Sequence, residues 1–215
     1  TADASDRYFN GHVQAIAGGE SEGGQLRRYY LDVVPWLWFL TRTTDCRIFQ
    51  EMTAPAIIEQ IFGDLGFSDY KLDLQGTHPA REYCVQYRES DFAFVCRLME
   101  EEGMFYFFTH EQGKHTLTIA DHKATHKFCP EKEIQFNRGS LEEDHISHWE
   151  HRWEFRTGKW AQTDYNFKKS TTNLMTRTGT LVKVPQNDKY EAYEHPGLYY
   201  VKGDGDARTK LRMEM

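Results

Sequence analysis

Histidine is the reactive side chain that gathers most densely in this 215-residue chain. Zinc needs three or four protein ligands that converge on one point at fixed distances. His122 and His126 would share a face only on a helix, and the segment around them has no apolar helical face. Histidines three residues apart alternate between the faces of a strand. We therefore expect solvated or core-edge histidines, and no metal or cofactor, at the candidate ligands His110, His115, His122, His126, Cys129, His145, His148 and His151.

Other catalytic motifs are missing from the sequence. It has no glycine-flanked serine of the hydrolase type and no glycine-rich phosphate loop. Gly203–Asp206 resembles part of a calcium loop but lacks the later glutamate. Glu101 and Glu102, beside an apolar strand, are the best carboxylate pair for glycoside hydrolysis. We predict that the chain is not an enzyme, and a cell-wall or metal-dependent hydrolase stays open as an alternative.

Aromatic side chains could also bind a ligand. Exposed rings can stack on sugars, but rings in runs more often fill a core or an oligomer interface. A carbohydrate-binding β-domain is therefore a second alternative, and it would rest on Tyr29, Tyr30, Trp36, Trp38, Tyr199 and Tyr200.

Composition disfavours several partners. The formal net charge is −7, so an acidic surface would repel the phosphates of nucleic acid and of anionic membranes. The strongest apolar run, Val33–Leu40, is too short to span a bilayer, which argues against stable membrane insertion. The four cysteines form no CxxC pair and suit free, buried thiols in a reducing cytosol.

The two ends of the sequence suggest a piece of a longer chain. The first residues lack the basic and apolar pattern of a signal peptide. The last residues, Asp206–Met215, indicate the start of a helix without a cap.

Strand patterns dominate the chain. Arg81–Arg88 alternates with the period of a half-buried strand. Met104–Thr109 is apolar on both faces and is predicted to be a central strand, followed by a hairpin with Gly113 in its turn. Ile146–Arg156 alternates aromatic with charged residues and is predicted to be a further strand. The prediction is a mainly β fold with small helical insertions (α+β).

Two helices interrupt the first half, at about residues 53–66 and 91–103. Thr53 and Ser90 are the expected N-caps, and Gly66 and Gly103 end the helices. The run Glu100–Glu102 occupies the last turn of the second helix, where the dipole disfavours anions. We interpret it as a solvated helix end or, alternatively, as a contact for a basic partner.

Four segments of the sequence resemble the Vgr family, which is related to the phage late-control D proteins and to the baseplate hub of contractile phage tails. The most specific is the longest, through its aromatic order and its Arg-Glu-Ser-Asp-Phe and Glu-Glu-Glu-Gly frame. The resemblance covers nearly the whole chain, and its segments are Arg7–Val13, Tyr29–Gln50, Arg81–Leu117 and Asp144–Arg152.

This resemblance implies a structural hub or spike component of a bacterial type VI secretion system. The family's hub has two β-barrel-like domains, which we assign to residues 1–130 and 131–215, with the boundary at Pro130–Asp144. It implies a homotrimer whose six barrels cap the hexameric Hcp tube and help to puncture target cells, with spike-tip and effector proteins as further partners. It also implies synthesis in the bacterial cytoplasm and expulsion by sheath contraction, without a signal peptide.

Overall fold

The computed structural model describes residues 7–22, 26–128, 133–139, 145–182 and 184–214. The predicted boundary loop therefore lies in part outside the described residues, and so does Cys129. Contacts between Cα atoms divide the chain into two compact units, Thr1–Thr125 and His126–Met215. Each unit is described by itself.

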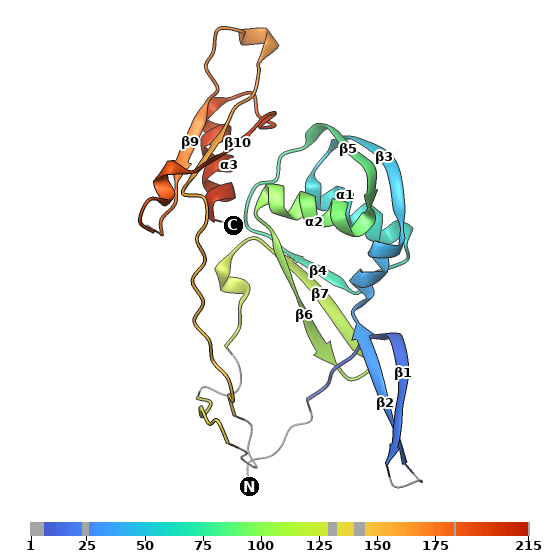
Figure 1. Cartoon of the computed structure of the whole chain (residues 1–215). Helices are drawn as coiled ribbons and strands as arrows, with labels where there is room; N and C mark the ends of the chain where they lie inside the picture. Colours follow the sequence, from blue (N-terminus) through green and yellow to red (C-terminus); the bar gives the residue numbers. More distant parts are fainter. Residues whose placement is uncertain (1–6, 23–25, 129–132, 140–144, 183, 215) are drawn as a thin grey trace. The chain divides into compact units, whose positions relative to one another are not determined.

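Within its described residues, the first unit holds three sheets and two α-helices (Figure 1). A two-stranded hairpin projects from it, and a second antiparallel pair and a three-stranded sheet, in the order β4-β7-β6, enclose the helices. The elements are β1 (His12–Glu22), β2 (Leu26–Val34), η1 (Trp36–Arg42), β3 (Thr44–Met52), α1 (Ala54–Asp64), β4 (Tyr70–Asp73), β5 (Arg81–Ser90), α2 (Asp91–Glu102), β6 (Phe105–Glu111), β7 (Lys114–Ala120) and η2 (Lys123–Thr125).

Both predicted helices are confirmed with their caps. The Thr53 hydroxyl accepts from the Ala56 amide at 3.2 Å, and the Ser90 hydroxyl accepts from the Ala93 amide at 3.1 Å. Past the helix ends, Gly66 and Gly103 adopt φ values of 78° and 69°, which glycine reaches without steric cost.

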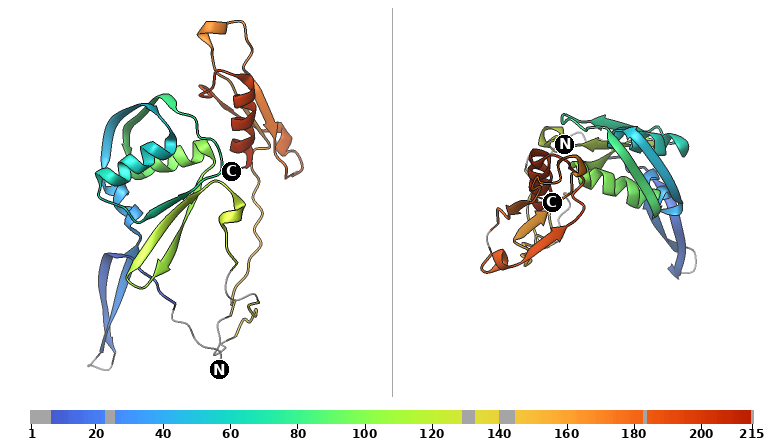
Figure 2. Two further views of the ribbon diagram at one scale, coloured as in Figure 1. Left: turned by 180° about the vertical axis from the view of Figure 1, so that it is seen from behind. Right: turned by 90° about the horizontal axis from the view of Figure 1, so that it is seen from above.

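The core of the first unit lies where α1 and α2 pack between the β3–β5 pair and the β4-β7-β6 sheet (Figures 1 and 2). Apolar residues at helical spacing on α1 and α2 form one side of this core, and apolar residues of β7 form another. The fully covered side chains include Leu37, Leu40, Ile57, Ile58, Ile61, Phe62, Phe94, Val95, Leu98, Leu117 and Ile119.

The prediction of a central strand at Met104–Thr109 is wrong. That segment forms β6 at the edge of the sheet, and β7 is the central strand, between β4 and β6. All residues of β7 from His115 to Ala120 are buried, although Thr116 and Thr118 alternate with His115, Leu117 and Ile119. The criterion of apolar residues on both faces of a strand therefore selected β6, whereas β7 is the central strand. The hairpin turn at Gly113 is confirmed, with φ of 75°.

The second unit is built on a small three-stranded sheet in the order β10-β8-β9. Its strands β8 and β10 run parallel, and β8 and β9 run antiparallel. Tyr199 lies under helix α3 and donates its hydroxyl proton to the carbonyl oxygen of Leu174 at 2.7 Å. The elements are β8 (Lys159–Gln162), η3 (Phe167–Lys169), β9 (Thr176–Gly179), η4 (Asn187–Lys189), β10 (Glu191–Glu194) and α3 (Lys202–Glu214).

The predicted strand Ile146–Arg156 is not a ladder strand. The only pairing recorded for it among the described residues is an isolated bridge between Ile146 and Phe136. Trp149 and Trp153 are both more than 70% exposed at 76% and 73%. The sequence alternates aromatic and charged residues here, but among the described residues this segment does not join a sheet.

The mainly β architecture with a few helices is confirmed. Over the described ranges the strands form four separate sheets that do not close into a barrel, so the barrel-like domains stay a prediction. None of the described helices has the length and apolar character needed to cross a membrane.

Candidate assembly surface

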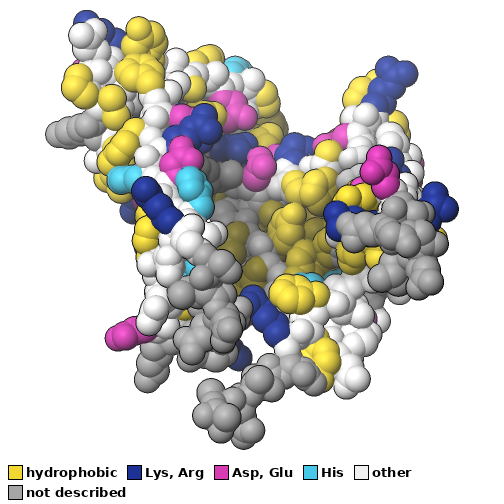
Figure 3. All heavy atoms as spheres, turned by 60° about the horizontal axis from the view of Figure 1, so that its bottom comes forward, with side chains coloured by type: hydrophobic (Ala, Val, Ile, Leu, Met, Phe, Trp, Pro, Cys, Tyr) yellow, Lys and Arg dark blue, Asp and Glu magenta, His cyan; other side chains and the backbone are white. Residues whose placement is uncertain are grey.

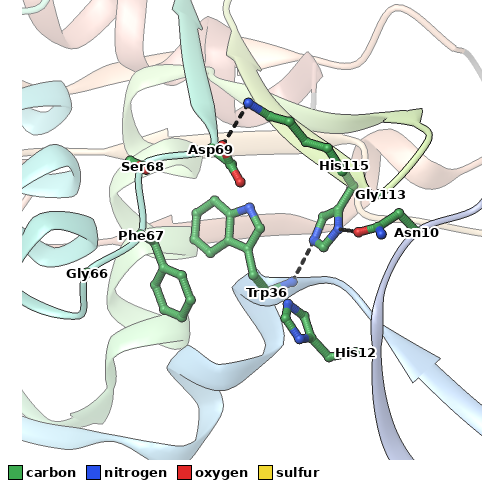
Figure 4. Close-up of a pocket in the computed structure, with 10 residues that line it drawn as sticks. Asn10, His12, Trp36, Gly66, Phe67, Ser68, Asp69, Gly113 and His115 are labelled. Atoms are coloured by element: carbon green, nitrogen blue, oxygen red, sulfur yellow. Dashed lines mark hydrogen bonds and ion pairs between the residues drawn. The ribbon is translucent and has the colours of Figure 1, made fainter.

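Among the candidate metal ligands that the structure describes, His115 is the most buried, and both of its ring nitrogens already have partners (Figure 4). Its Nε2 accepts from the backbone amide of Trp36 at 2.9 Å. Its Nδ1 lies 2.7 Å from the Asn10 side-chain oxygen and donates to it. This arrangement requires a neutral imidazole. Burial, together with the nearby rings of His12 and His110, lowers the pKa of His115 and favours that form.

The two hydrogen bonds of His115 therefore connect the segment before β1 to the core. They link the Asn10 side chain to the backbone amide of Trp36 at the start of η1. The pocket next to it is lined by Trp36 stacked on Phe67, with ring centroids 4.7 Å apart, and by an ion pair of Lys114 with Asp69 at 2.8 Å.

Apart from His110, whose ring centroid lies 6.0 Å from that of His115, the other described candidate histidines are dispersed. His122 lies 3.2 Å from Asp73, and His145 lies 3.1 Å from the carbonyl oxygen of Gly139. His148 pairs with Glu150 at 3.6 Å at the surface, and His151 packs on Trp153. Within the part of the chain that the structure describes, no group of three His, Cys, Asp or Glu residues is placed to hold a metal ion.

The carboxylates at the end of α2 are not solvated, so that interpretation of Glu101 and Glu102 is wrong. Arg81 contacts both of them, reaching Glu102 at 2.5 Å, and the two carboxylate side chains are only 6% and 8% exposed. A basic side chain of the same chain, Arg81, neutralises these two carboxylates. Glu100 is exposed.

Glu101 is poorly suited to acid catalysis. Burial disfavours the charged form of Glu101, but the guanidinium groups of Arg81 and Arg97 outweigh it and hold the pKa of Glu101 below its usual value. A general acid at neutral pH needs the opposite shift. We conclude that Glu101 serves stability.

Glu102 extends this ionic network to a neighbouring loop. His78 lies 3.2 Å from Glu102 through Nδ1 and 3.2 Å from Asp121 through Nε2. The Asp121 carboxylate also accepts hydrogen bonds from the backbone amides of Gln75 and Gly76, at 2.9 and 2.7 Å. The network ties the loop between β4 and β5 to the ends of α2 and β7.

The aromatic candidates for sugar binding divide between core and surface. Trp36 and Tyr199 are buried, Trp38 is half-buried, and Tyr29, Tyr30 and Tyr200 are exposed. Gly203–Asp206, the fragment of a calcium loop, lies in α3 for its whole length and forms no loop. Cys46 is exposed, contrary to the expected burial of the thiols, and Cys84 is buried.

The hairpin β1–β2 presents one apolar side to solvent, which we call the ribbon face. The register pairs Val13 with Val33, and Ile16 with Leu31. Because facing residues and every second residue of a strand share a side, Tyr29 lies on the same face. The five residues of the ribbon face, Val13, Ile16, Tyr29, Leu31 and Val33, are each more than half exposed.

A second apolar side, the outer face, lies on the β3–β5 pair. The predicted alternation of β5 is confirmed over Tyr83–Tyr87, but its aromatic side points outward, while Cys84 and Gln86 point inward and Arg88 is exposed. Gln86 is fully buried and donates to the Asp91 carboxylate at 2.8 Å, while Arg47 donates to Gln86 at 2.9 Å. The apolar residues of the outer face are Cys46, Ile48, Tyr83, Val85 and Tyr87, with the exposed Gln50 opposite Tyr83 on the same side.

Both faces are unusual for an exposed surface, because contiguous apolar patches of this kind mark interaction sites. Figure 3 shows hydrophobic side chains reaching the surface of the molecule beside Lys and Arg side chains. Sequence alternation could reveal both faces, but it does not tell which side of a strand turns to the core.

The comparison with protein families agrees with an assembly role. The family described as phage tail baseplate hub (GPD) matches residues 1–215. The chain belongs to this hub family. The hub chain is 40% identical to the type VI secretion system spike protein VgrG1b of Pseudomonas aeruginosa over 99% of its own length and 29% of that protein. It is 34% identical to the actin cross-linking toxin VgrG1 of Vibrio cholerae, over 95% of its length and 19% of the toxin.

Solved structures support the fold of the hub chain. An Escherichia coli protein, described as a type VI secretion component similar to the T4 phage tail proteins gp27 and gp5, aligns with a TM-score of 0.54 and 25% identity, covering 63% of this chain and 37% of that one. A tail protein from Neisseria meningitidis aligns over 94% of this chain and 57% of its own, with a TM-score of 0.56 and 13% identity. The hub chain thus spans less than a third of the length of VgrG1b.

Proposed function

We propose that this chain is a structural hub segment of a type VI secretion spike, acts as a homotrimer, and has no catalytic role of its own. Two barrel-like domains per chain, at residues 1–130 and 131–215, would give a ring of six. A pseudo-sixfold end can match a hexameric Hcp tube, because symmetric partners dock most fully when their symmetries agree.

The observation that carries this proposal is the match of the hub family to the whole chain, together with 40% identity to a spike protein. The ribbon face and the outer face support it independently, because exposed apolar strand faces suit a subunit of an assembly. The buried ion pairs of Glu101 and Glu102 weigh against the hydrolase alternative.

The proposal includes the route of the protein. It would be made in the bacterial cytoplasm, assemble with spike-tip and effector proteins, and be delivered to target cells by contraction, without a signal peptide. Nucleic acid and stable membrane insertion have no part in it.

Light scattering of the longest natural form of the protein tests the trimer, and co-sedimentation with Hcp hexamers tests the cap. A mass of three chains and retention on Hcp are expected. A persistent monomer that ignores Hcp would contradict the proposal. Metal analysis separates the hydrolase alternative, since one tightly bound zinc per chain would favour that alternative.

A further inference from the structure

We propose that His110 and His115, which we call the histidine clamp, hold the two ends of the β1–β2 hairpin in an acid-sensitive way. Mild acid would open both ends of the hairpin while the rest of the first unit stays folded. This inference goes beyond the proposed function and does not depend on it, because every contact that carries it lies within the unit Thr1–Thr125.

The β1–β2 hairpin is held to the first unit near its two ends. Among the described residues, β1 and β2 pair only with each other, and the hairpin projects from the rest of the unit (Figure 1). The chain enters the hairpin just after Asn10 and leaves it just before Trp36. The hydrogen bonds at these two residues therefore determine how firmly the hairpin is attached.

One histidine holds each end. The Asn10 backbone amide donates to Nδ1 of His110 at 3.2 Å, and the Trp36 backbone amide donates to Nε2 of His115 at 2.9 Å. His115 also links the two ends, because its Nδ1 donates to the Asn10 side-chain oxygen (Figure 4). His110 and His115 are direct partners in the register of β6 and β7. A single pair of facing residues thus carries both attachments.

Both attachments need an unprotonated ring nitrogen. A protonated imidazole donates from both nitrogens and accepts at neither. A proton on Nε2 of His115 would face the Trp36 amide, and a proton on Nδ1 of His110 would face the Asn10 amide. Each protonation therefore replaces a hydrogen bond by two opposed donors. Histidine is the side chain that gains its charge in mild acid.

The surroundings of His115 favour release of the hairpin in acid. The His12 ring lies 5.7 Å from that of His115, and a charge on either ring, or on His110, disfavours a charge on the others. Burial and these two histidines lower the pKa of His115 in the closed form. Asp69 acts in the opposite direction, but it is paired with Lys114 at 2.8 Å. Protons therefore bind more tightly when the hairpin is open, and acid shifts the equilibrium to that form.

The charged side chains near His110 include both signs. Glu111 follows His110 in β6 and faces Lys114 across the hairpin turn. Arg7 lies 5.1 Å from the ring centroid of Phe9, and that ring lies 6.0 Å from the ring of His110. Because a carboxylate and two cations lie on this side, a proton on His110 is not held by a single dominant anion.

Hydrogen–deuterium exchange of the full-length protein at pH 7.5 and pH 5.5, followed by mass spectrometry, measures the opening. Rates are corrected for the pH dependence of chemical exchange. One histidine with a pKa of about 6.5 in the open form raises the open fraction by up to about tenfold between these values. We expect this acceleration at the amides of Trp36 and Asn10, and none in the helices α1 and α2.

Two variants assign the effect to the clamp. His115→Gln should abolish the acid response at the Trp36 amide, and His110→Gln should abolish it at the Asn10 amide, because glutamine does not titrate in this range. His110 is exposed, so its variant tests the clamp even if His115→Gln fails to fold. The matched control is His122→Gln, which alters a histidine of the same unit that lies 3.2 Å from Asp73 and should keep both responses.

Three outcomes would contradict the inference. Exchange at the two amides that does not change with pH would show that acid does not open the clamp. An equal acceleration in α1 and α2 would show acid unfolding of the whole unit instead. A response that persists in both variants would place the sensitive group elsewhere. None of these outcomes bears on the proposed homotrimer, which light scattering tests separately.

Discussion

Arg81 shows at the scale of a single residue why the end of α2 tolerates three successive glutamates. It is 12% exposed and neutralises Glu101 and Glu102, which are buried beside it. A buried ion pair adds little stability over an apolar pair of the same shape, but removal of one partner leaves the other charge buried and unpaired.

We therefore expect Arg81→Met to lower the free energy of unfolding by about 3–5 kcal/mol, because two buried carboxylates lose their main partner. Urea denaturation followed by circular dichroism measures the change. The control is Arg152→Met, which removes an exposed ion pair with Glu154 and should change the free energy by less than about 0.5 kcal/mol. Equal effects of the two variants would contradict this role of Arg81.

His115 predicts a pH dependence of stability. Its pKa is lowered in the folded protein, so protons bind more tightly to the unfolded chain. The contribution of neutral His115 is fully present above the unfolded pKa of about 6.5 and is lost as the pH falls through the lower folded pKa. Unfolding in urea at pH 7.5 and pH 5.5 should show the loss, with a flatter profile for His115→Gln.

The matched control for this prediction is His148→Gln, which alters a histidine whose side chain is 80% exposed. Its profile should follow that of the unsubstituted protein. A steep profile that persists in His115→Gln would assign the effect to other groups near this site, which include His12, His110 and Asp69.

At the scale of elements, α3 contains two glycines with opposite surroundings. A Cβ added to Gly205 would overlap the buried ring of Tyr199, whose hydroxyl is fixed by the carbonyl oxygens of Leu174 and Gln162. A Cβ added to Gly203 would meet nothing within 4 Å.

Gly205→Ala is expected to destabilise the second unit by about 1–3 kcal/mol, because overpacking outweighs the better helix propensity of alanine. Gly203→Ala should instead stabilise it by up to about 1 kcal/mol. Thermal unfolding of the full chain measures both, and equal signs for the two variants would contradict the close contact between α3 and Tyr199.

Local signals predicted the helices well, and long-range pairing limited the prediction of strands. The caps Thr53 and Ser90 act within one turn, so sequence alone locates both helix starts. The position of β7 between β4 and β6 depends on pairing across about 47 residues of chain, which alternation does not encode.

The site was predicted only in part, for a similar reason. The aromatic alternation of β5 is visible in the sequence, but its outward direction follows from Gln86, whose buried amide is satisfied by Asp91 and Arg47 from other elements. The burial of Glu101 likewise depends on Arg81, twenty residues away in the chain.

At the scale of the whole molecule, the two units differ in their cores. All members of the main apolar cluster, from Trp36 to Ile119, belong to the first unit. The second unit buries mainly Ala161, Leu174 and Tyr199, together with polar groups such as Thr176 and Thr209. Small domains with little apolar burial are only marginally stable.

We therefore expect residues 1–125 expressed alone to unfold in one cooperative transition. Residues 126–215 alone should show a weak and broad transition, because their core is small. Circular dichroism during heating checks both pieces. A sharp transition of the second piece at the temperature of the first would contradict this difference.

The uneven burial of tryptophan gives the protein an intrinsic optical label. Trp36 is buried and packs against Phe62 and Phe67, whereas Trp149 and Trp153 are exposed to solvent. Fluorescence emission should therefore combine a shorter-wavelength band from the buried Trp36 and the half-buried Trp38 and Trp160 with a longer-wavelength band from the exposed pair. Replacing Trp149 and Trp153 by phenylalanine would remove the long-wavelength band, so that the remaining emission follows the folded cores without any added dye.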